Sequence, residues 1–213
     1  EAGKDILRVD GITKSLDGIK ILDNISFSMS RSDKIILLGE NDVAKSTLLK
    51  ILSGEMEADS GSYTWGVTIS KSFFPKDNSS YFMDGQYNLV DWLRQYSKNK
   101  DETFVRGFLG KMLFSGDEIH KKVSILSGGE KIRCMISKMM LVNANALLLD
   151  TPTNHLDLES IQAFNNNLVK FPGNIFMSSH DHEFIHSVCN RVIEFTPKGI
   201  IDKLMDYEQY IIE

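Results

Sequence analysis

The chain has 213 residues, of which 42% are hydrophobic and 25% are charged, and its formal net charge at pH 7 is −5. This composition is ordinary for a globular protein, and the length suits one large domain or two small ones. The negative balance excludes an overall attraction to nucleic acid, and no apolar run reaches the roughly 18–20 residues that span a bilayer.

Neither the start of the chain nor its cysteines indicate export. No charged-then-apolar signal peptide opens the sequence, and the opening "EAGKDIL", without a methionine, predicts a piece of a longer protein. Cys134 and Cys189 have apolar neighbours and belong to no C-x-x-C pair. We expect both to be buried, reduced thiols in a cytoplasmic protein.

The first elements predicted along the chain are short strands. Residues 6–12 ("ILRVDGI") are β-like, and residues 21–29 ("ILDNISFSM") alternate apolar and polar side chains as a half-buried strand does. Residues 34–39 ("KIILLG") form the continuous apolar run of a strand that is buried on both faces. A loop follows, and then a helix predicted over residues 45–54, which Gly54 would end.

The middle of the chain is predicted to be mainly helical. Residues 61–75 favour two strands or one bent strand, and helical spacing follows at 87–97 and 102–113. Residues 127–142 form the strongest helix candidate, with Ser127 as its N-cap.

Buried strands and helices alternate in the second half. The strands are predicted at 145–150 and 173–180, and the helices at 158–171 and 181–189. Such alternation favours a parallel α/β sheet.

The loop after the third strand, "GENDVAKST" (39–47), fits the phosphate-loop pattern G-x-x-x-x-G-K-[ST] in part. Backbone N–H groups at a helix N-terminus would cradle phosphate, Lys45 would add a charge, and the Ser46 hydroxyl would reach Mg²⁺. The predicted nucleotide-binding residues of this loop are Gly39, Glu40, Asn41, Asp42, Val43, Ala44, Lys45, Ser46 and Thr47.

Two residues of this loop depart from the pattern. Ala44 stands where the second glycine belongs, which would cost on the order of 1–2 kcal/mol if that position needs a positive φ. The Asp42 carboxylate, about 4 Å from phosphate charge, would cost roughly 1–4 kcal/mol. By itself the loop is also compatible with a strand–turn–helix that carries "KST" by chance.

Three further motifs carry candidate chemistry. "LSGGEKIR" (126–133) places glycines and a serine at a helix N-terminus, either as an anion-binding surface or as a plain N-cap. "ALLLD" ends a buried strand with Asp150, where Mg²⁺ beside a phosphate loop is held, although a strand before a proline turn has the same pattern. "SSHDHEFIH" (178–186) contains H-E-x-x-H, a zinc-hydrolase spacing, but no third ligand is evident. We favour His180 instead, at the same sheet edge as Asp150.

These motifs, in this order, resemble those of the nucleotide-binding domain of ATP-binding cassette (ABC) proteins over nearly the whole chain. Residues 39–47 match Walker A, 126–130 the cassette signature, 147–150 Walker B, 154–157 the D-loop, and His180 the switch histidine. "PTNHLD", "SGGEKIR" and "SHDHEF" look most like the ABC-F branch, which lacks membrane domains, carries two cassettes on one chain and acts at the ribosome.

The resemblance implies an α/β fold of the P-loop NTPase type. It has a mostly parallel sheet flanked by helices, an N-terminal antiparallel β subdomain and an inserted α-helical subdomain. Residues 1–213 would be a single domain, with β subdomain and core at 1–76 and 143–213 and the helical insert at about 77–142.

The resemblance also implies that ATP and Mg²⁺ are the cofactors. The partners would be a second cassette in the same full protein, of which this chain would be the C-terminal one, and the ribosome or RNA, contacted through the full protein. No membrane partner is expected.

The departures from the family pattern concern the nucleotide site. Thr151 stands where a glutamate normally polarises the attacking water, Lys76 stands at the Q-loop glutamine, and Leu16 at the aromatic that stacks on adenine. A threonine can orient water but is no base near pH 7. Beyond the phosphate loop, the implied roles are catalytic for Thr151 and His180, nucleotide-binding for Lys76, metal-binding for Ser46 and Asp150, partner-site for Ser127, Gly128, Gly129 and Glu130, and D-loop for Asp157.

We therefore expect an asymmetric cassette. Its own site would bind ATP more weakly, by a few kcal/mol, than a phosphate loop with both glycines, and it would hydrolyse ATP negligibly. Its signature would complete the partner's site. The alternatives are an ATPase subunit of a membrane transporter and a pseudo-cassette that binds a partner without nucleotide.

Overall fold

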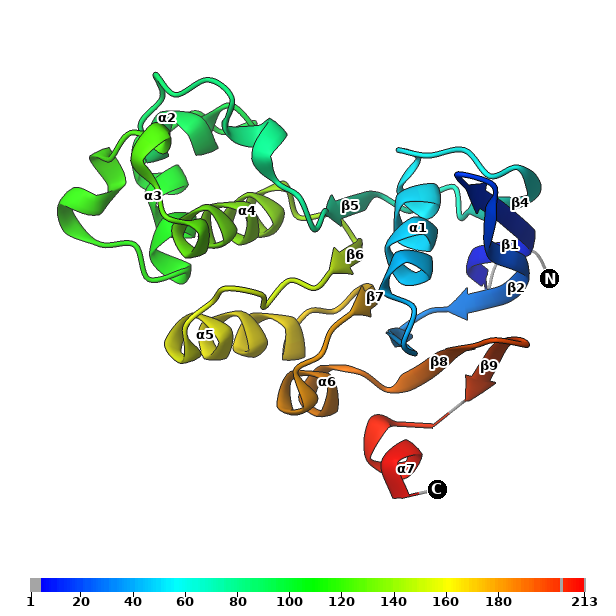
Figure 1. Ribbon diagram of the computed structural model, residues 1–213. Helices are drawn as coiled ribbons and strands as arrows, with labels where there is room; N and C mark the ends of the chain where they lie inside the picture. The colour runs from blue at the N-terminus through cyan, green and yellow to red at the C-terminus, as the bar shows by residue number, and fades with distance from the viewer. Residues whose placement is uncertain (1–4, 204, 213) are drawn as a thin grey trace. The chain divides into compact units, whose positions relative to one another are not determined.

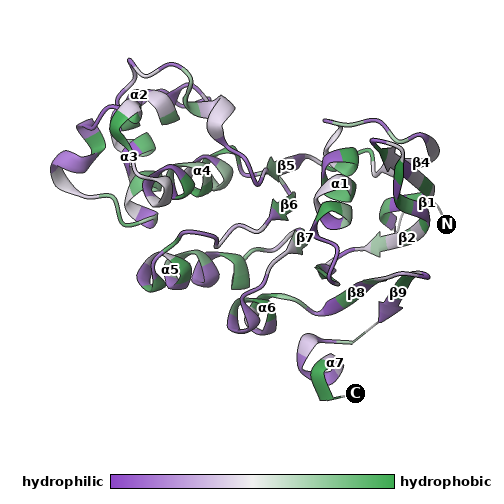
Figure 2. Cartoon of the chain, viewed as in Figure 1, coloured by the Kyte–Doolittle hydropathy of each residue, from purple (hydrophilic) through white to green (hydrophobic). Residues whose placement is uncertain are grey.

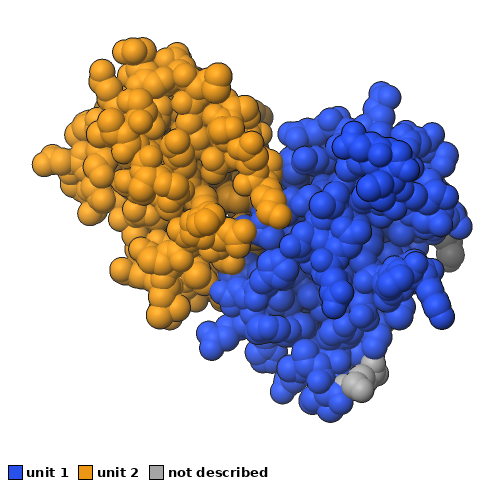
Figure 3. Space-filling model, viewed as in Figure 1, with its two compact units in different colours: residues 1–73, 145–151, 171–213 blue, residues 74–144, 152–170 orange. Residues whose placement is uncertain are grey.

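The computed structural model describes residues 5–203 and 205–212. The chain divides into two compact units (Figure 3). The first contains Glu1–Phe73, Asn145–Thr151 and Phe171–Glu213, and the second contains Phe74–Ala144 and Pro152–Lys170. Figure 1 shows the helices and strands of both.

The first unit begins with an antiparallel sheet in the order β2-β1-β4. Its strands are β1 (Asp5–Leu16), β2 (Ile19–Ser30) and β4 (Ser60–Trp65). Asp17 and Gly18 join β1 to β2 with φ angles of 50° and 78°, the left-handed pair that matches the twist of a two-residue hairpin. The predicted antiparallel β subdomain is confirmed, and its first two strands extend beyond the predicted ranges.

The second sheet has the order β5-β6-β7-β3-β8-β9. Its strands are β3 (Lys34–Leu38), β5 (Lys71–Phe74), β6 (Ala146–Asp150), β7 (Asn174–Ser178), β8 (Arg191–Thr196) and β9 (Gly199–Lys203). β6, β7, β3 and β8 pair in parallel, and β9 pairs antiparallel with β8. The predicted mostly parallel sheet is confirmed. The range 61–75 proves to be two strands in two different sheets, and β8 and β9 were not predicted.

The helices are α1 (Asp42–Ser53), α2 (Leu89–Arg94), α3 (Glu102–Lys111), α4 (Gly128–Val142), α5 (Leu158–Val169), α6 (His182–Val188) and α7 (Tyr207–Ile212). Helices α4, α5 and α6 alternate with strands in the second half of the chain, whereas α2, α3 and α4 follow one another without an intervening strand. Short 3₁₀ turns lie at Ser79–Phe82, Gly116–His120 and Val123–Ile125. Helices α1, α4 and α5 each carry both hydrophobic and hydrophilic residues (Figure 2), as partly buried helices do.

Helix α1 starts earlier than the predicted range of 45–54, at Asp42, because Asn41 caps it. The Asn41 side chain accepts a hydrogen bond from the Ala44 amide at 3.1 Å, which satisfies one of the amides that have no partner within the helix. Gly54 ends the helix in the left-handed conformation, as predicted, with φ of 89°.

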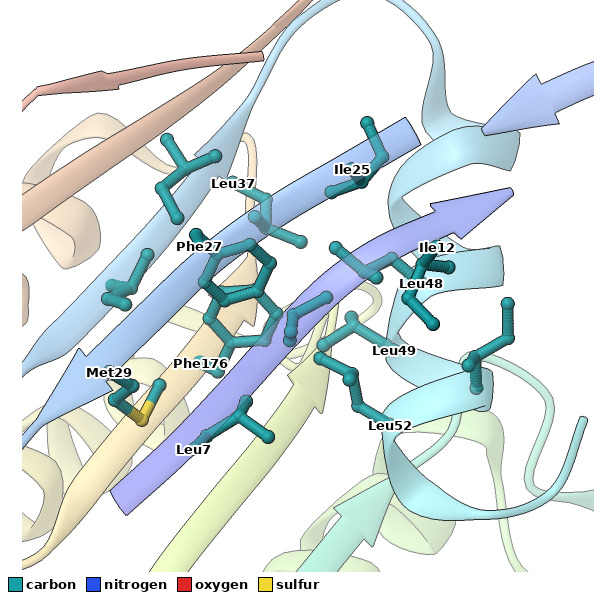
Figure 4. Close-up of a cluster of buried hydrophobic side chains, with 14 of the residues drawn as sticks. Leu7, Ile12, Ile25, Phe27, Met29, Leu37, Leu48, Leu49, Leu52 and Phe176 are labelled. Atoms are coloured by element: carbon teal, nitrogen blue, oxygen red, sulfur yellow. The ribbon is translucent and has the colours of Figure 1, made fainter. Parts of the chain in front are cut away.

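The core of the first unit lies between α1 and strands of both sheets (Figure 4). Leu48, Leu49 and Leu52 project from α1 into this cluster. Phe27 of β2 stacks on Phe176 of β7, with ring centroids 5.4 Å apart. Each such buried side chain stabilises the fold by about 1.5–3 kcal/mol, so this cluster fixes α1 against the parallel sheet.

The second unit has a core of its own. Trp92 of α2 is buried, stacks on Phe82 at 4.9 Å and donates a hydrogen bond to the Tyr81 carbonyl oxygen at 2.8 Å. The Lys138 ammonium of α4 lies over the rings of Tyr81 and Tyr96. These contacts join α2, α4 and the first 3₁₀ turn.

Both cysteines are free and buried, as predicted. Burial raises the pKa of the Cys134 and Cys189 thiols far above the usual value. Among the described residues, no helix combines the length and the apolar character that crossing a bilayer requires.

A matched pair of leucines tests the role of the core. Leu48 is fully buried and Leu158 is 78% exposed. We expect Leu48→Ala to lower the free energy of unfolding by about 2–5 kcal/mol, because it leaves a cavity under α1, and Leu158→Ala to change it by about 0.5 kcal/mol or less. Urea denaturation of both variants measures the difference, and equal losses would contradict the assigned core.

Candidate nucleotide-binding site

The parallel register brings three predicted site residues to one edge of the larger sheet. Ser178 of β7 aligns with Leu37 of β3 on one side and with Asp150 of β6 on the other. The carboxyl ends of these strands therefore lie together, which is where open α/β sheets bind ligands. Lys45 follows β3 on α1, Asp150 ends β6, and His180 follows β7.

The phosphate loop leaves β3 through a backbone conformation that requires glycine. Gly39 has φ of 124°, and a Cβ atom there would lie 2.6 Å from the carbonyl oxygen of Phe195. The loop is thus held against β8, and it enters α1 directly through the Asn41 cap.

Ala44 does not strain this loop. It lies within α1 and is 2% exposed, and helical residues have negative φ. The cost of 1–2 kcal/mol that a positive φ would have imposed is therefore absent. The second glycine of the pattern is not needed for the conformation that this loop adopts.

Lys45 is buried and already has two partners. Its ammonium donates a hydrogen bond to the Gly39 carbonyl oxygen at 2.8 Å and lies 2.9 Å from Oδ1 of Asp42. The same Asp42 oxygen lies 3.3 Å from Nε2 of His180. Asp42, which the sequence marked as a repulsive neighbour of phosphate, thus bridges the two residues that would attract phosphate.

Of the remaining loop residues, Thr47 is buried, Ser46 is half-buried and Val43 is exposed. Ser46 follows Lys45 in the first turns of α1. The residues that carry the hydroxyl and the buried ammonium are therefore adjacent in α1.

Asp150 is a buried carboxylate with an unmatched oxygen. Its side chain is almost fully buried, and Oδ1 accepts a hydrogen bond from the Ser178 hydroxyl at 3.0 Å. Among the described residues Oδ2 has no partner. A buried charged oxygen without a partner is costly, and a hard cation that is held by one or two carboxylates and by phosphate would satisfy it. The residues present therefore fit Mg²⁺.

Thr151, next to Asp150, has an uncommon backbone conformation. Its φ is 45°, which is rare for a β-branched residue. Its amide donates to the carbonyl oxygen of Ser178 at 3.0 Å and to the Ser178 hydroxyl at 3.2 Å, and among the described residues its buried hydroxyl has no partner. Ser178 thus hydrogen-bonds to both residues, a role that the sequence analysis missed although Ser178 is the first residue of the quoted stretch 178–186.

A cavity of about 590 Å³ adjoins the phosphate loop, within the range of small-molecule sites. Its lining residues are Ile21, Gly39, Glu40, Asn41, Ala44, Glu194, Phe195, Thr196 and Pro197. A second cavity of about 390 Å³ extends to Lys20 and Lys198 and shares five lining residues with the first: Ile21, Asn41, Phe195, Thr196 and Pro197. Leu16, expected near the adenine, is not among the described lining residues; Ile21 and the end of β8 are.

The signature residues lie in the second unit, at the start of α4. Ser127 accepts a hydrogen bond from the Glu130 amide at 3.2 Å, and Glu130 accepts one from the Ser127 amide at 3.1 Å, a capping box. Burial would raise the pKa of Glu130, but hydrogen bonds from Ser127 and Lys121 outweigh it and hold that pKa below its usual value. Gly128 has open space where a side chain would lie, whereas Gly129 approaches the His155 carbonyl oxygen.

Lys76 and Asp157 also belong to the second unit. Lys76 is exposed. Asp157 caps α5 and accepts a hydrogen bond from the Ser160 amide at 2.8 Å. Hydrogen bonds from the side chain and the amide of Ser160 lower the pKa of Asp157. Gly39–Thr47, Asp150, Thr151 and His180 are thus gathered in one unit, and Lys76, the signature and Asp157 in the other.

The H-E-x-x-H stretch (His182–His186) makes a packing contact with α7 through His182. Nδ1 of His182 is hydrogen-bonded to the Tyr207 hydroxyl, and the two rings stack. In residues 5–203 and 205–212, no group of three or more His, Cys, Asp or Glu side chains is arranged to hold a metal ion. The stretch instead joins α6 to α7.

The strand order, the loop before α1 and the buried acid define a nucleotide-binding α/β domain, and comparison with known proteins identifies its family. The family model described as "ABC transporter" matches residues 22–154. The chain therefore belongs to this family, as one of its nucleotide-binding domains.

The chain is similar to several curated bacterial proteins. It is 60% identical over 212 residues to the uncharacterized ABC transporter ATP-binding protein YkpA of Bacillus subtilis, covering 99% of this chain and 39% of that protein. It is 31% identical over 219 residues to the energy-dependent translational throttle protein EttA of Escherichia coli, covering 98% of this chain and 39% of that protein. The chain thus spans about two-fifths of these relatives.

Solved cassette structures share the fold. A nucleotide-free ATP-binding cassette from an ABC transporter superposes with a TM-score of 0.77 at 17% identity, covering 98% of this chain and 94% of that one. A putative metal-chelate type ABC transporter gives 0.73 at 19% identity, covering 94% of this chain and 83% of that one. The predicted fold class is confirmed.

Two glycines with nearly equal φ isolate the contact that holds the phosphate loop. Gly199 has φ of 123°, and no atom of the described residues lies within 4 Å of where its Cβ would be, whereas Gly39 faces the Phe195 backbone. We expect Gly199→Ala to lower the free energy of unfolding by about 1–2 kcal/mol. Gly39→Ala should lower the free energy of unfolding by about 1–3 kcal/mol more than Gly199→Ala does, because the added methyl group overpacks against Phe195. Thermal or urea unfolding measures both, and equal losses would show that the loop does not depend on this contact.

Proposed function

We propose that this chain is one cassette of an ABC-F type protein that acts in translation at the ribosome, in the cytoplasm. Its resemblance in the "PTNHLD" and "SGGEKIR" stretches and its similarity to the translational throttle protein support this proposal. Both units would form a single cassette, with residues 77–142 as the helical insert. The chain spans only 39% of that relative, which leaves room for a second cassette in a full protein of that length.

The observation that carries nucleotide binding is the Asp150 oxygen that has no partner among residues 5–203 and 205–212, at the sheet edge that also holds the phosphate loop. The α1 amides and Lys45 would bind phosphate, and Asp150 with Ser46 would hold Mg²⁺. When bound, Mg²⁺ would neutralise phosphate charge and orient the phosphates. The cavity bounded by Ile21 and Phe195 would receive the nucleoside.

The residues of this site support binding better than hydrolysis. Thr151, at the position where the family has a glutamate, offers a buried hydroxyl that can orient water but cannot accept its proton near pH 7. His180 lies at the same edge, where it can contact an anion that is held by Lys45. The site would therefore hold ATP and turn it over negligibly by itself.

The signature would act on the partner cassette. Ser127, Gly128 and Gly129 start a 15-residue helix, whose N-terminus attracts anions. In the full protein this surface would close over the nucleotide of the other cassette. A transporter ATPase subunit is the second candidate, favoured by the description of the YkpA relative as an ABC transporter ATP-binding protein.

Calorimetry with ATP and Mg²⁺ tests whether the site binds nucleotide. We expect binding at submillimolar to millimolar ATP that Lys45→Ala abolishes, because the buried ammonium is lost. Asp150→Asn should remove the Mg²⁺ dependence. Absence of binding at millimolar ATP would instead support a pseudo-cassette that needs no nucleotide.

The asymmetric role is tested in the full two-cassette protein. We expect Ser127→Arg to lower ATPase turnover by at least about tenfold, since it obstructs the partner's site, and Lys45→Ala to lower it much less. The purified 213-residue chain should show negligible turnover by itself. Unchanged turnover in Ser127→Arg with a complete loss in Lys45→Ala would contradict the assignment.

A further inference from the structure

The Asp42 carboxylate contacts the two residues of the site that would attract phosphate. One of its oxygens lies 2.9 Å from the Lys45 ammonium and 3.3 Å from Nε2 of His180. We propose that Asp42 is an internal competitor of the nucleotide, which must be displaced from both residues before phosphate binds. This inference rests on the proposed nucleotide-binding function.

The Lys45 ammonium cannot serve Asp42 and a phosphate equally. It has three hydrogen-bond donors; one is directed to the Gly39 carbonyl oxygen and the ammonium lies 2.9 Å from Oδ1 of Asp42, which leaves one donor for phosphate. Because the Lys45 side chain is buried, its ammonium cannot move to another position to bind a second anion. If Asp42 stayed in place, its charge would lie beside the phosphate and repel it.

The exposure of Asp42 and His180 allows the Asp42 side chain to move away from the site. The Asp42 side chain is 46% exposed and that of His180 is 61% exposed, so both can turn toward water without opening the core. Because a single oxygen of Asp42 contacts both residues, its departure frees the two together. A phosphate in the place of this oxygen would contact both Lys45, at the phosphate loop, and His180, at the end of β7.

A purely structural role for Asp42 makes the opposite prediction. Asp42 is the acidic residue of the first turn of α1, where a carboxylate stabilises a helix through its dipole. If that were its only role, Asp42→Asn would lower stability and would not improve nucleotide binding. Under the proposed role, the same variant binds nucleotide more tightly whatever its effect on stability.

The test compares Asp42→Asn with Glu208→Gln by calorimetry with ATP and Mg²⁺. Glu208 is an exposed acid in the first turn of α7, so Glu208→Gln changes the net charge equally at a site outside the phosphate loop. Thermal melting of each variant establishes that it is folded. We expect Asp42→Asn to lower the dissociation constant for ATP about tenfold, equivalent to ~1.4 kcal/mol, and Glu208→Gln to match the wild type.

The outcomes separate this inference from the proposed function. Measurable ATP binding by the wild type with no gain in Asp42→Asn over Glu208→Gln would overturn the competitor role and leave the nucleotide site standing. Absence of binding in both the wild type and folded Asp42→Asn at millimolar ATP would overturn both. A gain confined to Asp42→Asn supports both.

Discussion

The site depends on the parallel register of β6, β7 and β3. Ser178 aligns with Leu37 and with Asp150, so the strand ends meet at one edge although they are far apart along the chain. The stacked pair of Phe27 and Phe176 lies in the core cluster that also contains the buried leucines of α1. A shift of any of these strands by one residue would turn its alternating side chains to the opposite face and separate the acid from the phosphate loop.

The same edge contains features that local stability would not favour. Asp150 is a buried carboxylate, and Thr151 has a positive φ; within the described part of the chain, one Asp150 oxygen and the Thr151 hydroxyl have no hydrogen-bond partner. Strained and incompletely bonded groups of this kind collect at functional sites, where surrounding structure holds them in place. Here Ser178 is that support, since it hydrogen-bonds to both residues.

Much of this arrangement could be predicted from the sequence, because apolar runs and helix caps are local signals. The strands at 34–39, 145–150 and 173–180, the Ser127 cap and the Gly54 terminus are all present. β8 and β9 were missed. β8 opens with Arg191, a buried residue whose charge is balanced by Asp33 and Asp202, and such long-range ion pairs leave no local pattern.

The details of the phosphate loop also required the structure. Ala44 seemed costly in sequence because a glycine is absent, but the helix starts early enough to include it. Asp42 was recognised as a charge near phosphate, whereas its contact with His180 depends on the pairing of β3 with β7. Cavity residues such as Phe195 come from a strand distant in sequence, so no spacing rule could have identified them.

The most direct measurement is a crystal structure of the chain with Mg²⁺ and a non-hydrolysable ATP analogue. The account predicts phosphates at the N-terminus of α1 in contact with Lys45, the metal ion beside Asp150, and Asp42 turned away from both Lys45 and His180. A nucleotide bound elsewhere, or one bound at this edge while Asp42 still contacts Lys45 and His180, would contradict it.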